Sequence, residues 1–64
     1  MSSPSPPRLV KTLDSYNIVF YGGFYYGLPH KLGEVHLESE EEVVSRFPGV
    51  IKDHSLDQVV TQIP

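Results

Sequence analysis

The sequence predicts a small α+β domain, in which an antiparallel sheet of three to four strands carries two short helices on one face. Two runs rich in aromatic and β-branched residues, 16–21 and 24–28, flank a Gly-Gly pair, and a third apolar run precedes them at 8–13. Later in the chain, two capping-box motifs at 39–42 and 55–58 stand before apolar residues, as they do at helix starts. Together these observations indicate strands first and helices after them.

The segment around Gly22-Gly23 is the part on which the rest of the chain depends. Two glycines between apolar runs are typical of a β-hairpin with a primed two-residue turn, because glycine adopts a positive φ without steric cost. Residues paired across the turn share a face of the sheet. One face then carries Ile18, Phe20, Tyr25 and Gly27, and the other carries Val19, Tyr21, Phe24, Tyr26 and Leu28. Neither face is polar, so we expect the helices to cover one and an interface to use the other.

The remaining strands are predicted on either side of this hairpin. The run 8–13 supplies a third strand, since three strands with an apolar face are about the minimum for independent stability. Pro29 is expected to end the hairpin, because proline cannot donate a hydrogen bond to the ladder. Alternation of polar and apolar residues predicts a short strand at 34–37, and one more short strand is expected at 50–52.

Two helices follow from the capping motifs. In the first, Ser39 is the expected N-cap and the helix runs to about Arg46 before Pro48-Gly49 breaks it. Its expected buried residues are Val43, Val44 and Phe47. In the second, Ser55 is the expected N-cap and the helix ends at Pro64. Its apolar stripe, at helical spacing, consists of Leu56, Val59, Val60 and Ile63.

Length and composition limit the function classes. Residues 1–7 are Pro/Ser-rich and are predicted to be a disordered leader, and 8–64 to form a single small α+β domain. So short a chain buries only about 60% of its unfolded surface. It has no cysteine, which excludes disulfides and thiolate metal sites and fits the cytoplasm. Oligomerisation or packing against a larger protein is the remaining common source of stability.

Charge and hydropathy argue against two kinds of partner. Five basic residues against eight acidic ones give a net charge of −3, and the basic residues are spread along the chain, which argues against nucleic acid. No apolar run approaches the roughly 20 residues that span a bilayer, so no membrane partner is expected.

The residue types that carry catalysis occur without the spacing that catalysis needs. His30, His36 and His54 match no metal-ligand pattern, so no metal or cofactor is expected. The run 53–55, Asp-His-Ser, contains triad residue types, but a triad arises by convergence in space rather than by adjacency. The carboxylates at 38–42 suit the positive end of a helix dipole. A chain this short also leaves little room for a pocket of about 300–1,000 Å³, so no enzymatic activity is expected.

The aromatic residues of the hairpin are the candidate functional residues. The predicted interaction face consists of Tyr21, Phe24, Tyr25, Tyr26 and Phe20. These side chains suit a hydrophobic core, a protein interface, or a platform that stacks on sugar rings, and the sequence leaves all three open. A sugar module is expected to leave Tyr25 or Tyr26 exposed with Asn17 or His30 beside the ring.

One string of residues supports a family resemblance. The pattern Tyr16-Asn17-Ile18-Val19, Tyr21-Gly22, Tyr25-Tyr26-Gly27-Leu28-Pro29, then Leu32-Gly33 and Pro48-Gly49-Val50, resembles short segments of unassigned function attached to bacterial glycosyltransferase-like polypeptides. The resemblance covers residues 8 to 63 and carries no catalytic residue; where this chain has His30, the pattern often has glutamine. It implies an accessory module near carbohydrate or cell-envelope metabolism.

The expected function is therefore a non-enzymatic, cytoplasmic protein-interaction or oligomerisation module that acts through the aromatic face of the hairpin. Its partner is a protein or a second copy of the chain in a homodimer. The alternative is a carbohydrate-binding accessory module associated with glycosyl-transfer enzymes.

Overall fold

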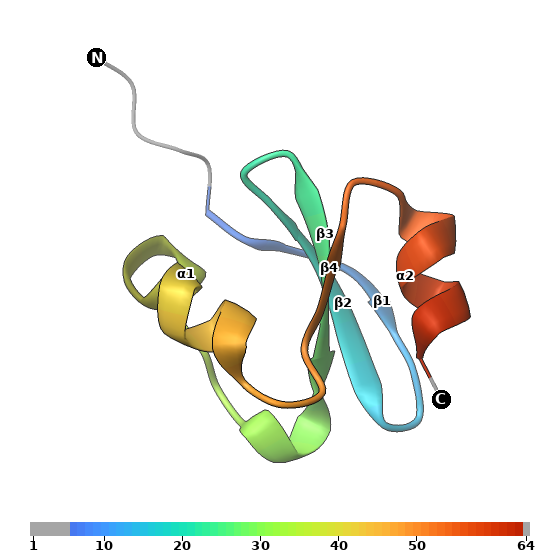
Figure 1. The fold of residues 1–64 in the computed structure, drawn as a ribbon, viewed down its shortest axis with the longest axis horizontal. Helices are drawn as coiled ribbons and strands as arrows, with labels where there is room; N and C mark the ends of the chain where they lie inside the picture. Colours follow the sequence, from blue (N-terminus) through green and yellow to red (C-terminus); the bar gives the residue numbers. More distant parts are fainter. Residues whose placement is uncertain (1–5, 64) are drawn as a thin grey trace.

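The computed structural model describes residues 6–63, and in it the chain forms a four-stranded antiparallel sheet with two helices (Figure 1). The strands are β1 (Arg8–Thr12), β2 (Tyr16–Tyr21), β3 (Phe24–Pro29) and β4 (Ile51–Asp53), and they lie side by side in chain order. A 3-10 turn, η1 (His30–Leu32), and helix α1 (Leu37–Arg46) connect β3 to β4, and helix α2 (Leu56–Gln62) follows β4. The predicted α+β fold class is confirmed.

The central hairpin has the predicted register. Tyr21 pairs with Phe24, Phe20 with Tyr25, and Ile18 with Gly27. Gly22 and Gly23 have φ values of 60° and 86°, the two positive angles that a type I′ turn requires. Because every side chain in a strand alternates between faces, this register also fixes the two predicted sets of apolar residues on opposite faces.

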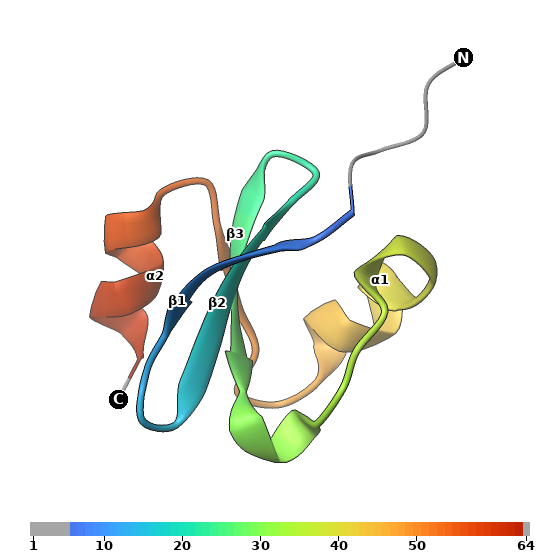
Figure 2. The same cartoon turned by 180° about the vertical axis from the view of Figure 1, so that it is seen from behind.

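The two helices lie on opposite sides of the sheet, so the prediction that both pack on one face is wrong (Figures 1 and 2). Helix α1 packs over Tyr26 and Leu28 through Leu37 and Val44. Helix α2 approaches the other face at Gly27, where a Cβ atom would lie 3.1 Å from Val59 Cγ1. Both faces of the hairpin are apolar, and Ile18 on the second face is completely buried. One helix on each face shields the centre of both sets from water, with Ile18 on one side and Tyr26 and Leu28 on the other.

Helix α1 starts earlier than its capping motif predicts. It begins at Leu37 with His36 as N-cap, and no side chain caps it. Ser39 is inside the helix, where its Oγ donates to the His36 carbonyl at 3.4 Å, and the backbone kinks at Glu40 (φ −125°, ψ 21°). The predicted strand at 34–37 is likewise absent from the described chain. The reason is Leu37, which is only 1% exposed: it enters the core as the first residue of the helix rather than as the end of a strand.

Helix α2 follows its sequence pattern more closely. Ser55 is the N-cap, as predicted, but its side chain makes no capping hydrogen bond; instead its backbone N–H donates to Asp53 Oδ1 at 3.3 Å. Val59, in the middle of the apolar stripe, is fully buried. The helix ends at Gln62 rather than Pro64. Pro64, and residues 1–5 of the predicted leader, lie outside the described residues.

Substitutions at the two neighbouring valines of α1 test which face of the helix is packed against the sheet. Val44 is 4% exposed and Val43 is 72% exposed, so only the first of them is buried, although both were predicted to be; Phe47 is also exposed, at 36%. We expect Val44→Ala to lower the free energy of unfolding by about 2 kcal/mol, because it leaves a cavity between α1 and the sheet. Val43→Ala, the matched control, should change it by no more than about 0.5 kcal/mol. Urea denaturation measures both, and equal effects would contradict this packing.

Candidate functional site

The five aromatic residues of the predicted interaction face divide between the two sides of the sheet. Phe20 and Tyr25 lie on the side of α2, with ring centroids 4.9 Å apart. Tyr21, Phe24 and Tyr26 lie on the side of α1. Tyr26 is only 2% exposed and belongs to the core, whereas Phe20 and Phe24 are each 39% exposed. The five residues therefore form no single surface. Of the three on the α1 side, Tyr26 is buried, Tyr21 is half-buried and Phe24 is exposed.

An open hollow lies between the tip of the hairpin and α1, and we call it the hairpin groove. Its volume is about 450 Å³. Its lining is Tyr21, Gly22, Phe24, Tyr26, Leu37, Glu38, Ser39, Glu40, Glu41, Glu42, Val43 and Lys52. One wall is aromatic and the other is the acidic start of α1. The expectation that so short a chain leaves little room for a pocket is not met, since this volume is in the range of about 300–1,000 Å³ that ligands occupy.

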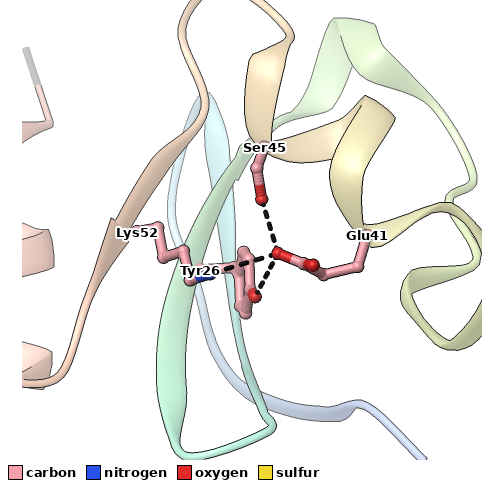
Figure 3. A network of polar contacts seen from close by, with 4 residues as sticks. All are labelled: Tyr26, Glu41, Ser45 and Lys52. Atoms are coloured by element: carbon pink, nitrogen blue, oxygen red, sulfur yellow. Dashed lines mark hydrogen bonds and ion pairs between the residues drawn. The ribbon is translucent and has the colours of Figure 1, made fainter.

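A single carboxylate oxygen connects the two walls of the groove. Glu41 Oε2 accepts hydrogen bonds from Ser45 Oγ at 2.8 Å, from the Tyr26 hydroxyl at 3.1 Å and from Lys52 Nζ at 3.1 Å (Figure 3). Tyr26 belongs to β3, Lys52 to β4, and the other two residues to α1. The network therefore holds α1 at a fixed distance from the sheet, which keeps the groove open.

These contacts change the protonation equilibria of the network. The Ser45 hydrogen bond, with those of Lys52 and Tyr26, lowers the pKa of Glu41 below its ordinary value. The Glu41 hydrogen bond raises the pKa of Lys52. Burial is the main cause of the raised pKa of Tyr26, so its hydroxyl stays protonated and able to donate. At neutral pH the network therefore consists of a carboxylate, an ammonium and a neutral phenol.

Lys52 also lies against the aromatic wall. Its Nζ is 4.7 Å from the centroid of the Phe24 ring and 5.4 Å from that of Tyr26. Both distances are within the roughly 6 Å at which a cation is attracted to the face of an aromatic ring. The loop before β4 is fixed by the Tyr16 hydroxyl, which donates to the Gly49 carbonyl at 2.9 Å. This contact helps to place Lys52 opposite Glu41.

The negative charge of the protein is concentrated in the groove. Four carboxylates and one ammonium line it, which gives a formal charge of −3. The remaining four acidic and four basic residues of the chain balance one another, so the groove accounts for the whole net charge of −3. Within residues 6–63, Glu40 and Glu42 have no ion pair, and Glu38 approaches only His36, at 3.7 Å.

The histidines lie elsewhere and apart from one another. His30 contacts Asn17 at 3.1 Å, and His54 is 3.1 Å from Asp53. His36 lies beside Glu34 and Glu38, with its side chain 59% exposed. Residues 6–63 contain no group of three or more histidine or carboxylate side chains arranged to hold a metal ion. Asp53, His54 and Ser55 form no triad, because Ser55 is the N-cap of α2 and the His54 side chain is 83% exposed.

Sequence reasoning missed the residues that complete the groove. It assigned Glu41 to the helix dipole and gave Lys52 no role, and the two are eleven residues apart, a separation without a local signal. Of the contacts to Glu41, only that with Ser45 has a sequence signal, because the two residues are four apart on one helix.

Comparisons of the chain with known proteins identify no relative. No family model matches the chain, and no curated protein and no solved structure is similar to it. Among the described residues, none of the helices is long and apolar enough to cross a membrane.

The hydrogen bonds to Glu41 make the stability of the domain depend on pH. Because the folded pKa of Glu41 lies below the unfolded one, its stabilising effect is present above the unfolded value and is lost as the pH falls through the folded value. We expect Glu41→Gln to lower the melting temperature at pH 7. The difference from wild type should shrink as the pH falls from about 5 to about 3. Glu42→Gln is the matched control on the same helix, and calorimetry across this range should show little difference from wild type for it. A difference for Glu41→Gln that is constant with pH would contradict the assignment.

Proposed function

We propose that this chain is a non-enzymatic protein-interaction module that binds a segment of a partner protein in the hairpin groove. The observation that carries the proposal is the position of Phe24. Phe24 is 39% exposed and lines an open hollow together with Val43, which is 72% exposed. Aromatic residues are enriched at protein–protein interfaces, and a few of them in well-packed pockets dominate the binding energy.

The walls of the groove are held in place before any partner binds, which supports the same proposal. Phe24 directly follows the tight turn at Gly22-Gly23, and the Lys52 ammonium lies 4.7 Å from its ring. The bonds to Glu41 tie the opposite wall to β3 and β4. A preformed site loses less conformational freedom on binding than a mobile one, so more of the contact energy appears as affinity.

A carbohydrate-binding accessory module is the second candidate. In its favour, the groove places the Tyr21 and Phe24 rings opposite carboxylates, a combination that also suits a sugar. Against it, Tyr26 is buried and Tyr25 is half-buried. Asn17 and His30 contact each other at the base of the hairpin, away from these rings. We therefore rank the protein partner first, and we place the module in the cytoplasm, with which its lack of cysteine is compatible.

The two exposed phenylalanines provide a matched test. Phe24 and Phe20 are equally exposed but lie on opposite faces, and only Phe24 lines the groove. We expect short random peptides displayed on phage to be enriched by the immobilised wild-type chain. The enriched peptides should bind Phe24→Ser at least about tenfold more weakly, as for a hot-spot residue. They should bind Phe20→Ser as well as wild type does, and isothermal titration measures these affinities.

Other results of this experiment have definite meanings. Failure to enrich any peptide, or equal weakening by Phe24→Ser and Phe20→Ser, would contradict the proposal. Far-ultraviolet circular dichroism of each variant shows whether it is folded. An array of oligosaccharides, probed with the same three proteins, tests the second candidate: binding that Phe24→Ser abolishes would replace the protein partner with a sugar.

Self-association is tested separately. Light scattering over a concentration series gives the mass of wild type, Phe24→Ser and Tyr25→Ser. For a module whose partner is another protein, we expect all three to stay monomeric, because the acidic grooves of two copies repel each other. A dimer that Phe24→Ser dissociates would make a second copy the occupant of the groove, and one that Tyr25→Ser alone dissociates would place the interface on the α2 side.

A further inference from the structure

We infer that the occupant of the hairpin groove is a cationic side chain, an arginine or lysine, presented by a peptide segment of the partner. This inference deepens the proposed function and rests on it. It adds the chemistry of the ligand: a positive charge that lies on the Phe24 ring and faces the carboxylates of α1.

Charge complementarity is the first argument. The groove holds a formal charge of −3, whereas the rest of the chain is electrically balanced. Lys52 is already engaged by Glu41, and Glu40 and Glu42 have no ion pair within residues 6–63. These two carboxylates are exposed to water, so they attract a cationic ligand and repel an anionic one. A cation in the groove compensates them and is attracted to this site from solution.

The chemistry of the aromatic wall is the second argument. Phe24 and Tyr26 already attract an ammonium group, that of Lys52, at 4.7 Å and 5.4 Å from their ring centroids. Phe24 as a residue remains 39% exposed in the presence of this lysine. The exposed part of the ring is open to a second cation, and the planar guanidinium of arginine stacks on such a surface particularly well.

Local helix electrostatics do not account for the arrangement. Glu38 and Glu40 are in the first turn of α1, where the helix dipole favours them wherever they point. The dipole does not require an open hollow with an exposed phenylalanine on the facing strand, and this chain has both. The apolar stem of a long basic side chain fits against Val43 and Tyr21 while its charged end reaches the carboxylates.

Blocked pentapeptides with a single central residue test the inference. The probes carry arginine, citrulline or glutamate between alanines; citrulline has the shape of arginine without its charge. We expect the arginine peptide to shift the amide resonances of Tyr21, Phe24 and Glu40 in a nuclear magnetic resonance titration. It should bind at least about fivefold more tightly than the citrulline peptide, and raising the salt from about 20 to about 300 mM should remove most of this preference.

Matched charge variants test the location. Glu40→Gln/Glu42→Gln removes two negative charges from the groove, and Glu34→Gln/Asp57→Asn removes two from outside it. The first pair should weaken binding of the arginine peptide by about five- to tenfold, and the second by less than about twofold. Equal binding of arginine and citrulline peptides, no binding of either, or equal effects of the two double variants would overturn the inference.

These experiments distinguish failure of the cationic-ligand inference from failure of the proposed function. If phage-displayed peptides bind in a Phe24-dependent manner but lack enriched arginine and lysine, the interaction module stands and its cationic ligand does not. If no peptide is enriched and the arginine pentapeptide shifts no resonance, both are wrong.

Discussion

The pairing of β2 with β3 around Gly22-Gly23 is the interaction on which the rest of the structure depends. It creates a ribbon whose two faces are both apolar, with Ile18 and Gly27 on one side and Tyr26 and Leu28 on the other. In a chain of 64 residues such a ribbon cannot be covered by a second sheet, and each face needs its own helix. Helices α1 and α2 therefore lie on opposite sides of the sheet (Figure 1).

The two helices cover their faces in different ways. Gly27 has no side chain, so α2 lies close to the strands, and a Cβ atom there would be 3.1 Å from Val59. On the other face Tyr26 is bulky and bears a hydroxyl that must be satisfied, and the Glu41 carboxylate of α1 accepts its hydrogen bond at 3.1 Å. This polar contact lies beside the apolar packing of Tyr26 and Leu28 against Leu37 and Val44. The space beside it is the hairpin groove.

The groove brings together an aromatic wall and an acidic wall that have separate structural reasons to exist. Phe24 is where it is because the turn at Gly22-Gly23 directs it to the α1 side, opposite Tyr21. The carboxylates are favoured by the start of the helix. Their juxtaposition leaves one surface with the entire net charge of the protein and an exposed ring.

By itself the sequence determined the elements whose causes are local. The hairpin register follows from two glycines and a period of two, and the N-cap position and buried Val59 of α2 follow from a helical stripe. Tertiary structure decided the rest. Helix α1 begins at Leu37 because burial of this side chain in the core fixes the start of the helix. The two helices lie on opposite faces because both faces of the sheet carry apolar side chains. Lys52 contacts both Phe24 and Glu41 because β4 pairs with β3. Contacts between residues far apart in the chain leave no periodic signal, so only the folded chain reveals the site.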